Sequence, residues 1–277
     1  MLTTSLDGLW ALQVLAGIEV LAPELGLRPH LPSVETPELV LHHHAAAELR
    51  AAGVIDAAGI VDETVVEWLT VLSRRDVAVL LSVRTPAAGV EQERIMLARF
   101  AEWWVCVERF GNRVRLSGAG TATSEQSAAL LIAAQIERLC GPMPPAPLKP
   151  ATIGVAEILS AVTDPATLRT FLLGRRLDSD QVAILTLAAD PQRSAQASAV
   201  AIQAGIGSGP TRAHIESGAV TIIDTPQGRL VCEHVKRGGK SWMIASPGSR
   251  ANISSAVLAM LRNLPAHEQW YSHRKVV

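Results

Sequence analysis

The chain has 277 residues, enough for one large hydrophobic core or for two domains. Its formal net charge is -1 and its Lys and Arg residues are scattered, which argues against a nucleic-acid-binding surface. Charged residues make up only 18% and the mean hydropathy is +0.24, so part of the surface is expected to be apolar and to meet a partner.

The cysteines and the apolar runs predict the compartment. Cys106, Cys140 and Cys232 are dispersed and form no C-x-x-C pair, a pattern typical of reduced thiols in a cytoplasm. The first residues lack the basic and then apolar order of a secretory signal, and no uncharged apolar run reaches membrane-spanning length. We therefore expect a cytoplasmic protein without membrane insertion.

The first half of the chain predicts helices, then an antiparallel meander, then a closing helix. Asp7 is the expected cap of the first helix, and four prolines between residues 23 and 37 mark an extended crossing. Further helices are predicted over residues 38–52, 62–73 and 124–139, and strands over 77–83, 95–100, 103–110 and 114–117. Gly111-Asn112 supplies a tight hairpin turn.

Prolines mark the best boundary of the chain. Residues 142–150 read PMPPAPLKP, the composition of a stiff extended connector. We therefore predict an N-terminal half over residues 1–141, a proline-rich connector over 142–150 and a C-terminal half over 151–277.

The second half repeats the plan of the first. Helices are predicted over 154–162, 165–174 and 179–189, strands over 193–203, 220–224, 229–234 and 241–246, and a last helix from its cap Ser249 to Leu264. The two halves end alike, which indicates an internal duplication or a chance likeness of two α+β units. We predict an α+β fold of two pseudo-symmetric halves, each an antiparallel meander with packed helices. We expect the halves to form one continuous body. A small antiparallel meander is stable only when helices cover its apolar face or further strands extend its edge.

Asp224 ends the β-branched run VTIID, where a carboxylate could hold Mg²⁺ beside a nucleotide. The only glycine-rich loop, Gly205-Ile-Gly207-Ser-Gly209, lacks the lysine of a phosphate-binding loop. Pro226 and Gly228 instead fit the second and fourth places of a type I turn, whose N–H groups Asp224 would bind. The hairpin is favoured. A small-molecule or nucleotide-binding enzyme that uses Asp224 and the loop from Gly205 to Gly209 is the alternative.

No constellation of residues predicts a catalytic, cofactor or metal site. His42, His43 and His44 would point about 100° apart on a helix and so cannot share a metal from one face, which favours a solvated helix face. No G-x-S-x-G elbow occurs, and Cys106 is most simply a small core residue.

The strand over residues 193–203 is the best candidate for a partner surface. On one face the strand carries a row of alanines, on which a helix can pack. The other face mixes polar and apolar side chains, which is typical either of an open sheet face that receives a partner or of a plain solvated face. The candidate partner-binding residues are Gln196, Ser198, Val200 and Gln203 in the strand and Ser208 and Arg212 in the loop that follows it. Gln203 falls on the alanine face unless a bulge re-aims it, and Arg212 is the expected hot spot.

Three longer stretches resemble one protein family. "LDGLWALQVLAGIEVLAPELGLRPHLP", "VTIIDTPQGRLV" and "SPGSRANISSAVLAMLRNLPAHEQWYSHR" are similar, in order and spacing, to the opening, the hairpin and the closing helix of EspG proteins of mycobacterial type VII (ESX) secretion systems.

The resemblance implies a cytosolic chaperone without catalysis or cofactor. EspG proteins bind the helical tip of PPE proteins in PE–PPE heterodimers, keep them soluble and hand them to the secretion machinery. In the family, the partner surface lies on the central sheet and the C-terminal helical part. A purely structural homo-oligomer is a further alternative, and weak self-association through a vacant site is also expected.

Overall fold

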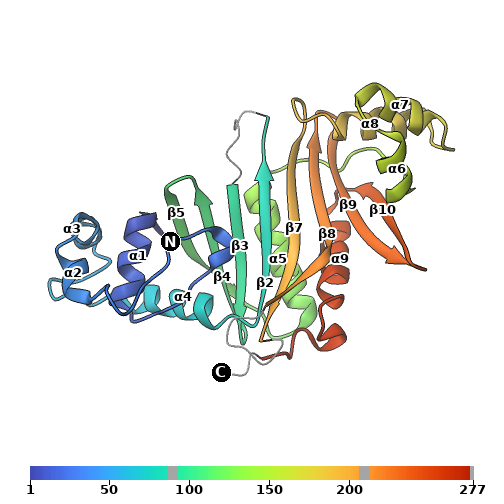
Figure 1. Cartoon of the computed structure of the whole chain (residues 1–277). Coiled ribbons are helices and arrows are strands. Elements are labelled where there is room, and N and C mark those ends of the chain that lie inside the picture. Colours follow the sequence, from blue (N-terminus) through green and yellow to red (C-terminus); the bar gives the residue numbers. More distant parts are fainter. Residues whose placement is uncertain (87–92, 206–212, 275–277) are drawn as a thin grey trace.

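A single antiparallel sheet forms the body of the protein. The computed structural model describes residues 1–86, 93–205 and 213–274. Within them, ten strands hydrogen-bond in the order β1-β5-β4-β3-β2-β7-β8-β9-β10-β6 (Figure 1). Their bounds are β1 Leu2–Ser5, β2 Val77–Arg84, β3 Glu93–Phe100, β4 Trp103–Phe110, β5 Arg113–Thr121, β6 Ala151–Gly154, β7 Ala195–Ala204, β8 Ala213–Thr225, β9 Gly228–Arg237 and β10 Lys240–Pro247.

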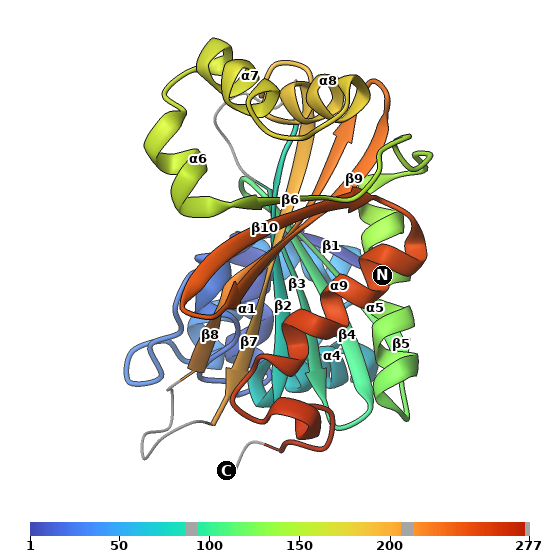
Figure 2. The same ribbon diagram turned by 90° about the vertical axis from the view of Figure 1, so that its right-hand side faces the viewer.

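Helices cover both faces of this sheet unequally. On one face the two closing helices, α5 and α9, lie side by side across its middle (Figure 2). On the other face, α1 to α4 cover the outer strands of the N-terminal half, and α6 to α8 cover those of the C-terminal half (Figure 1). The helices are α1 Leu6–Leu15, α2 Pro37–Leu41, α3 His44–Ala51, α4 Glu63–Arg74, α5 Glu125–Cys140, α6 Val155–Ala161, α7 Pro165–Leu173, α8 Ser179–Ala188 and α9 Arg250–Arg262, with short 3₁₀ turns η1 Pro23–Leu25 and η2 His267–Gln269.

The two halves repeat one topology. Each begins with a short strand and helices, continues with four strands and ends with a helix, and in each the short strand pairs with the last of the four (β1 with β5, β6 with β10). The halves meet where β2 pairs antiparallel with β7. The predicted α+β fold of two pseudo-symmetric halves in one body is therefore confirmed, while the boundaries 1–141, 142–150 and 151–277 stay a prediction.

Several local predictions were wrong at the ends of elements. Strands β1 and β6 were missed, because four residues at a sheet edge give too little alternation to detect. Ser5, not Asp7, caps α1 by accepting from the N–H of Gly8. Strand β8 begins at Ala213, seven residues before the prediction, because its first half is polar and partly exposed and therefore looks like loop.

Asp224 lies beside the predicted turn but binds a different group. Thr225, not Asp224, closes the turn, since its hydroxyl accepts from the N–H of Gln227. The Asp224 carboxylate accepts two hydrogen bonds from Arg229, at 2.6 and 2.7 Å. The expectation that Asp224 binds the N–H groups of the turn is therefore wrong, because the guanidinium directly across the hairpin is the stronger donor.

Arg229 joins three parts of the chain. Its Nη2 donates to the carbonyl oxygens of Cys140 and Gly141 at the end of α5, and its own backbone pairs with Pro144 and Ala146 of the proline-rich segment. Its side chain is only 3% exposed. The proline-rich segment is thus tied to β9, and the ion pair with Asp224 neutralises a charge that the fold buries.

The chain end packs between the two halves. Trp270 is fully buried, and its ring N–H donates to Glu125 at the start of α5, which also accepts two hydrogen bonds from Arg262 of α9. Arg99 of β3 donates to the carbonyl oxygens of Trp270 and Tyr271. These contacts fasten the segment after α9 to the N-terminal half. No described helix combines the length and apolarity that crossing a membrane would require.

We predict that Asp224→Ala lowers the free energy of unfolding by about 3 kcal/mol, because it leaves the buried guanidinium of Arg229 without its counter-charge. Urea denaturation measures this loss. The matched control is Glu157→Ala, which removes a more exposed carboxylate 3.1 Å from Arg175 and should cost less than about 1 kcal/mol. Equal losses of unfolding free energy in the two variants would show that the ion pair of Asp224 with Arg229 stabilises the fold no more than an exposed ion pair does.

A second prediction concerns acid stability. The hydrogen bond from Arg262 is the largest cause that lowers the pKa of Glu125 below its ordinary value of 4.5. The stabilisation is therefore complete above that value and is lost as the pH falls through the lower pKa of the folded chain. Glu125→Gln should lose less stability than the wild type when the pH is lowered from about 7 to about 4. Denaturation curves at the two pH values test this, and the same loss in both proteins would contradict it.

Candidate functional site

The middle of the sheet is open on the face opposite α5 and α9. There, between the two groups of helices, the paired strands β2 and β7 run side by side (Figure 1). Gln196, Ser198 and Val200 project from β7 on this side and are half-buried, while Ala197, Ala199 and Ala201 pack under α5 and α9. We call the half-buried side chains of Leu80, Ser82, Gln196, Ser198 and Val200, together with Arg84, the central face.

A row of polar side chains crosses this face from strand to strand. Arg84 donates to the Gln196 side chain at 3.0 Å, the Gln196 amide lies 3.5 Å from the Ser198 hydroxyl, and Ser198 lies 3.4 Å from the Thr221 hydroxyl of β8. The last two contacts are long and therefore weak. The row is thus ordered by its own neighbours but can exchange these bonds for those of a bound partner.

Apolar side chains lie next to this polar row. Val200 is paired with Leu80 across the β2–β7 ladder and with Ala219 across the β7–β8 ladder. All three are half-buried. The central face therefore offers hydrogen-bonding groups and apolar ground together, which is the composition of a protein-binding surface.

The other predicted site residues are not all brought to this face. Gln203 is 2% exposed and lies on the alanine side, where its side-chain carbonyl accepts from the N–H of Ala266 at 3.0 Å. The bulge between Val200 and Ile202 does not turn it outward. Ser208 and Arg212 lie outside the described residues. The structure thus groups Gln196, Ser198 and Val200 and separates Gln203 from them.

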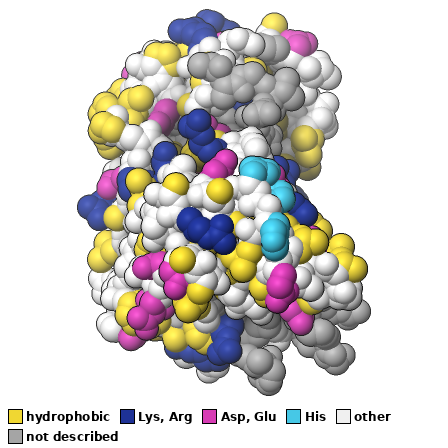
Figure 3. All heavy atoms as spheres, turned by 90° about the vertical axis from the view of Figure 1, so that its left-hand side faces the viewer, with side chains coloured by type: hydrophobic (Ala, Val, Ile, Leu, Met, Phe, Trp, Pro, Cys, Tyr) yellow, Lys and Arg dark blue, Asp and Glu magenta, His cyan; other side chains and the backbone are white. Residues whose placement is uncertain are grey.

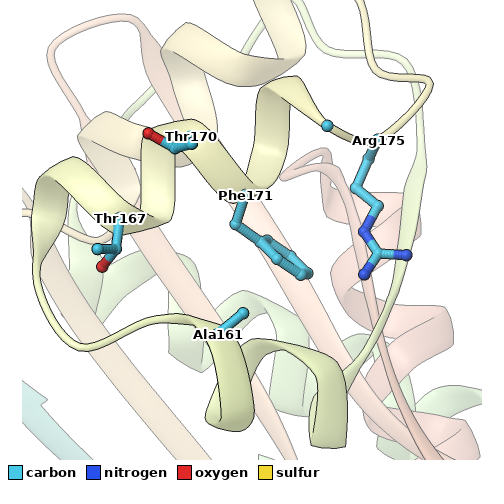
Figure 4. A pocket seen from close by; sticks show the side chains of 6 residues that line it. Ala161, Thr167, Thr170, Phe171 and Arg175 are labelled. Carbon is cyan, nitrogen blue, oxygen red and sulfur yellow. The ribbon is translucent and has the colours of Figure 1, made fainter.

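Helices α6 and α7 add an exposed apolar surface that the sequence did not reveal. None of the residues of α6 is buried, and Leu159 and Leu173 are 77% and 61% exposed. A shallow cavity of about 410 Å³ lies between the two helices, and Phe171 and Arg175 point into it (Figure 4). The Arg175 guanidinium is 4.5 Å from the centre of the Phe171 ring. Leucines in short helices look like core residues in a sequence, so only the tertiary structure shows that these two face outward.

In the alternative site, Asp224 lies far from Gly205, the described end of the glycine-rich loop, and residues 206–209 of that loop lie outside the described residues. Asp224 is paired with Ala195 at the start of β7, whereas Gly205 follows the end of β7. An extended strand rises about 3.3 Å per residue, which separates the two by roughly 30 Å. One nucleotide cannot reach both.

The three histidines do not form the predicted continuous helix face. His42 ends α2 and His43 caps α3, so the helix predicted over residues 38–52 is broken between them. Histidine side chains gather on the face that Figure 3 shows, and ligand atoms of Asp7, His43 and His44 lie within 4.8 Å of one another. Two contacts occupy groups that a cation would need. The Asp7 carboxylate is paired with Arg28 at 3.0 Å, and His43 Nδ1 accepts a hydrogen bond from the N–H of Ala45.

The thiols are poor nucleophiles. Burial raises the pKa of Cys106 and of Cys232 to about 12 and that of Cys140 to about 11, so all three are protonated at neutral pH. All three are free cysteines.

Comparison with known proteins gives one consistent family. The model of the EspG family matches residues 5–259. The chain is 50% identical over 278 residues to "ESX-2 secretion-associated protein EspG2" of Mycobacterium tuberculosis, with 100% of both chains covered. It is 26% identical to "ESX-5 secretion-associated protein EspG5" of the same species, with 99% of this chain and 97% of the relative covered.

A solved structure shares the fold. It is described as the Mycobacterium tuberculosis type VII secretion system chaperone EspG5 in complex with the PE25–PPE41 dimer. The two chains superpose with a TM-score of 0.76 and cover 98% of this chain and 99% of the other. Their sequence identity is 22%, so this likeness concerns the fold.

The separation of Asp224 from Gly205 yields a prediction. Nucleotides with Mg²⁺ should leave the melting temperature unchanged, because no single ligand can contact both residues and stabilise the fold by mass action. A thermal-shift screen of ATP, GTP and NAD with Mg²⁺ measures this. A rise in the melting temperature that disappears in Asp224→Asn would restore the nucleotide-binding alternative.

Proposed function

The chain belongs to the EspG family, and on this premise we propose that it is a cytosolic chaperone for PE–PPE heterodimers. It binds the helical tip of the PPE subunit, keeps the pair soluble and delivers it to a type VII (ESX) secretion system. The name of the relative at 50% identity, an ESX-2 secretion-associated protein, points to the second ESX system.

The observation that carries this proposal is the open central face. α5 and α9 cover the seam between the halves on one side, while on the other side Gln196, Ser198 and Val200 stay half-exposed between two groups of helices. A sheet face with a mixed polar and apolar surface, bounded by walls on two sides, suits the end of a helical bundle. The fold shared with the EspG5 of the PE25–PPE41 complex supports the same class of partner.

Apolar residues of the central face supply the apolar part of the proposed interface. Helix α8 packs on β8, so the helical layer of the C-terminal half stands along one side of the central face (Figure 1). Helix α6 contacts β10 and the edge strand β6, so Leu159 lies toward the outer edge of the sheet. Burying Leu80 and Val200 under a helical tip would add hydrophobic stabilisation to the hydrogen bonds of the polar row.

We assign the contacts as follows. Gln196, Ser198 and Val200 touch the PPE tip, and Arg84 orients Gln196 through their hydrogen bond. Ser208 and Arg212 stay sequence-based candidates. Gln203 is left out, because its side chain is buried against Ala266.

We predict that Ser198→Arg abolishes binding of the cognate PE–PPE pair, because a bulky charge on the central face clashes with the partner and is buried without a counter-ion. Isothermal titration calorimetry with the purified pair should show a loss of at least about a hundredfold in affinity, the range expected for a buried unpaired charge. Circular dichroism should show an unchanged fold.

The matched control is Ser33→Arg, which places the same side chain on an exposed loop of the N-terminal half. It should bind as the wild type does. Wild-type affinity of Ser198→Arg would remove the central face as the partner site, whereas failure of the wild type to bind any PE–PPE pair encoded in its genome would remove the proposed function.

A further inference from the structure

A second surface lies on the N-terminal half, away from the central face. A groove of about 610 Å³ runs between helix α4 and strands β4 and β5. Glu63, Val66, Glu67, Trp68, Thr70 and Val71 of α4 form one wall, and the opposite side is formed mainly by Phe100, Trp103, Val105, Gly118 and Gly120. In the strand order β5-β4-β3-β2-β7, four spacings of about 4.8 Å separate β5 from β7, or roughly 19 Å.

Aromatic side chains are concentrated in this groove. The whole chain has 6 Trp and 3 Phe, and the groove is lined by Trp68, Trp103 and Phe100, while the side chain of Trp104 is buried on the opposite face of the sheet. Trp103 is 55% exposed. Large aromatic side chains left in water at the edge of a groove are typical anchors of protein interfaces, because each buries much apolar area at little cost in conformational entropy.

Two glycines form the floor. Between Trp104 and Val105 the β4–β5 ladder contains a bulge, and at this bulge Gly120 has a φ of +122°, a conformation that other residues rarely adopt. A Cβ on Gly118 would lie 3.2 Å from Nε1 of Trp68. The groove therefore depends on the absence of a side chain at Gly118, whereas a Cβ on Gly120 would meet Leu131 of α5 on the opposite face of the sheet.

The wall of the groove is acidic. Glu63 and Glu67 are exposed on α4, and among the described residues neither forms an ion pair. Glu102, also exposed, directly precedes Trp103. Carboxylates without counter-charges beside the exposed Trp103 and the partly buried Trp68 complement a partner with Lys or Arg, which binds both the carboxylate and the ring face.

The strand that borders the groove has a free edge. Strand β1 pairs with β5 only from Arg113 to Leu116, whereas β5 continues to Thr121. Beyond Leu116, no strand of the described chain pairs with β5 on this side. Unpaired N–H and C=O groups of a strand edge are a template for an added strand.

We propose that this groove is a second protein-binding site, which takes an extended peptide segment with apolar side chains flanked by Lys or Arg on one face. The segment pairs with the free edge of β5, its apolar side chains pack on Trp68 and Trp103, and its cations bind Glu63 and Glu67. This proposal does not rest on the function proposed above, and the distance between the two surfaces allows both to be occupied together.

The test uses the full chain and two synthetic peptides, acetylated and amidated, with the sequences KSLSLSK and ESLSLSE. In an extended peptide, residues 1, 3, 5 and 7 share a face, so the first peptide presents Leu and Lys together. Calorimetry should show binding of KSLSLSK with a Kd below about 1 mM. The Glu peptide should not bind, and amide hydrogen exchange over residues 117–121 should slow only with KSLSLSK.

Three variants locate the site. Trp103→Ala removes an anchor, Glu67→Gln removes a charge and Gly118→Ala narrows the floor, and each should weaken peptide binding at least about tenfold while the circular dichroism spectrum stays that of the wild type. The matched controls Leu159→Ala and Glu48→Gln change exposed residues elsewhere and should bind the peptide normally. Absence of peptide binding, equal binding of the Glu peptide, or normal binding by Trp103→Ala would each overturn the proposal.

Discussion

The pairing of β2 with β7 is the constraint on which the rest of the structure depends. It joins two small meanders into one sheet. Each meander alone would leave an additional strand edge exposed to water. On the covered side, Val79 and Leu81 of β2 stand opposite Ala201 and Ala199 of β7. Large side chains beside small ones leave room for α5 and α9 to pack across the seam, and the two halves therefore share one core.

The same pairing explains why the opposite side of the seam is open. On this side α4 packs on β3, β4 and β5 and α8 packs on β8, so among the buried residues of the two central strands only Ala78 of β2 and Ile202 of β7 join the core beneath the N-terminal helices (Figure 1). The ion pair of Asp224 with Arg229 ties the proline-rich segment to β9, and the buried Trp270 fastens the chain end beneath α5. The central face is thus held on a rigid support and needs little reordering to bind, which favours affinity.

The central face and the groove at α4 would bind their partners through different interactions. The central face combines a hydrogen-bonded row with half-buried apolar residues and is suited to the end of a helical partner. The groove at α4 combines the exposed Trp103, two carboxylates without an ion pair among the described residues and a free strand edge, and it suits an extended basic segment. A chaperone that delivers cargo benefits from two such sites, because a second partner can then be recruited without displacing the first.

The sequence by itself determined most of the elements, their repetition in two halves and the two faces of β7, because alternation and caps are local signals that survive without tertiary contacts. It did not determine the short edge strands β1 and β6, which only their pairing with β5 and β10 defines. It also determined that Gln196, Ser198 and Val200 share a face. Only the tertiary structure decided that Asp224 pairs with Arg229, that Gln203 is buried against Ala266 and that the leucines of α6 and α7 face outward. These outcomes depend on which distant residue arrives opposite each side chain, and local periodicity carries no information about that.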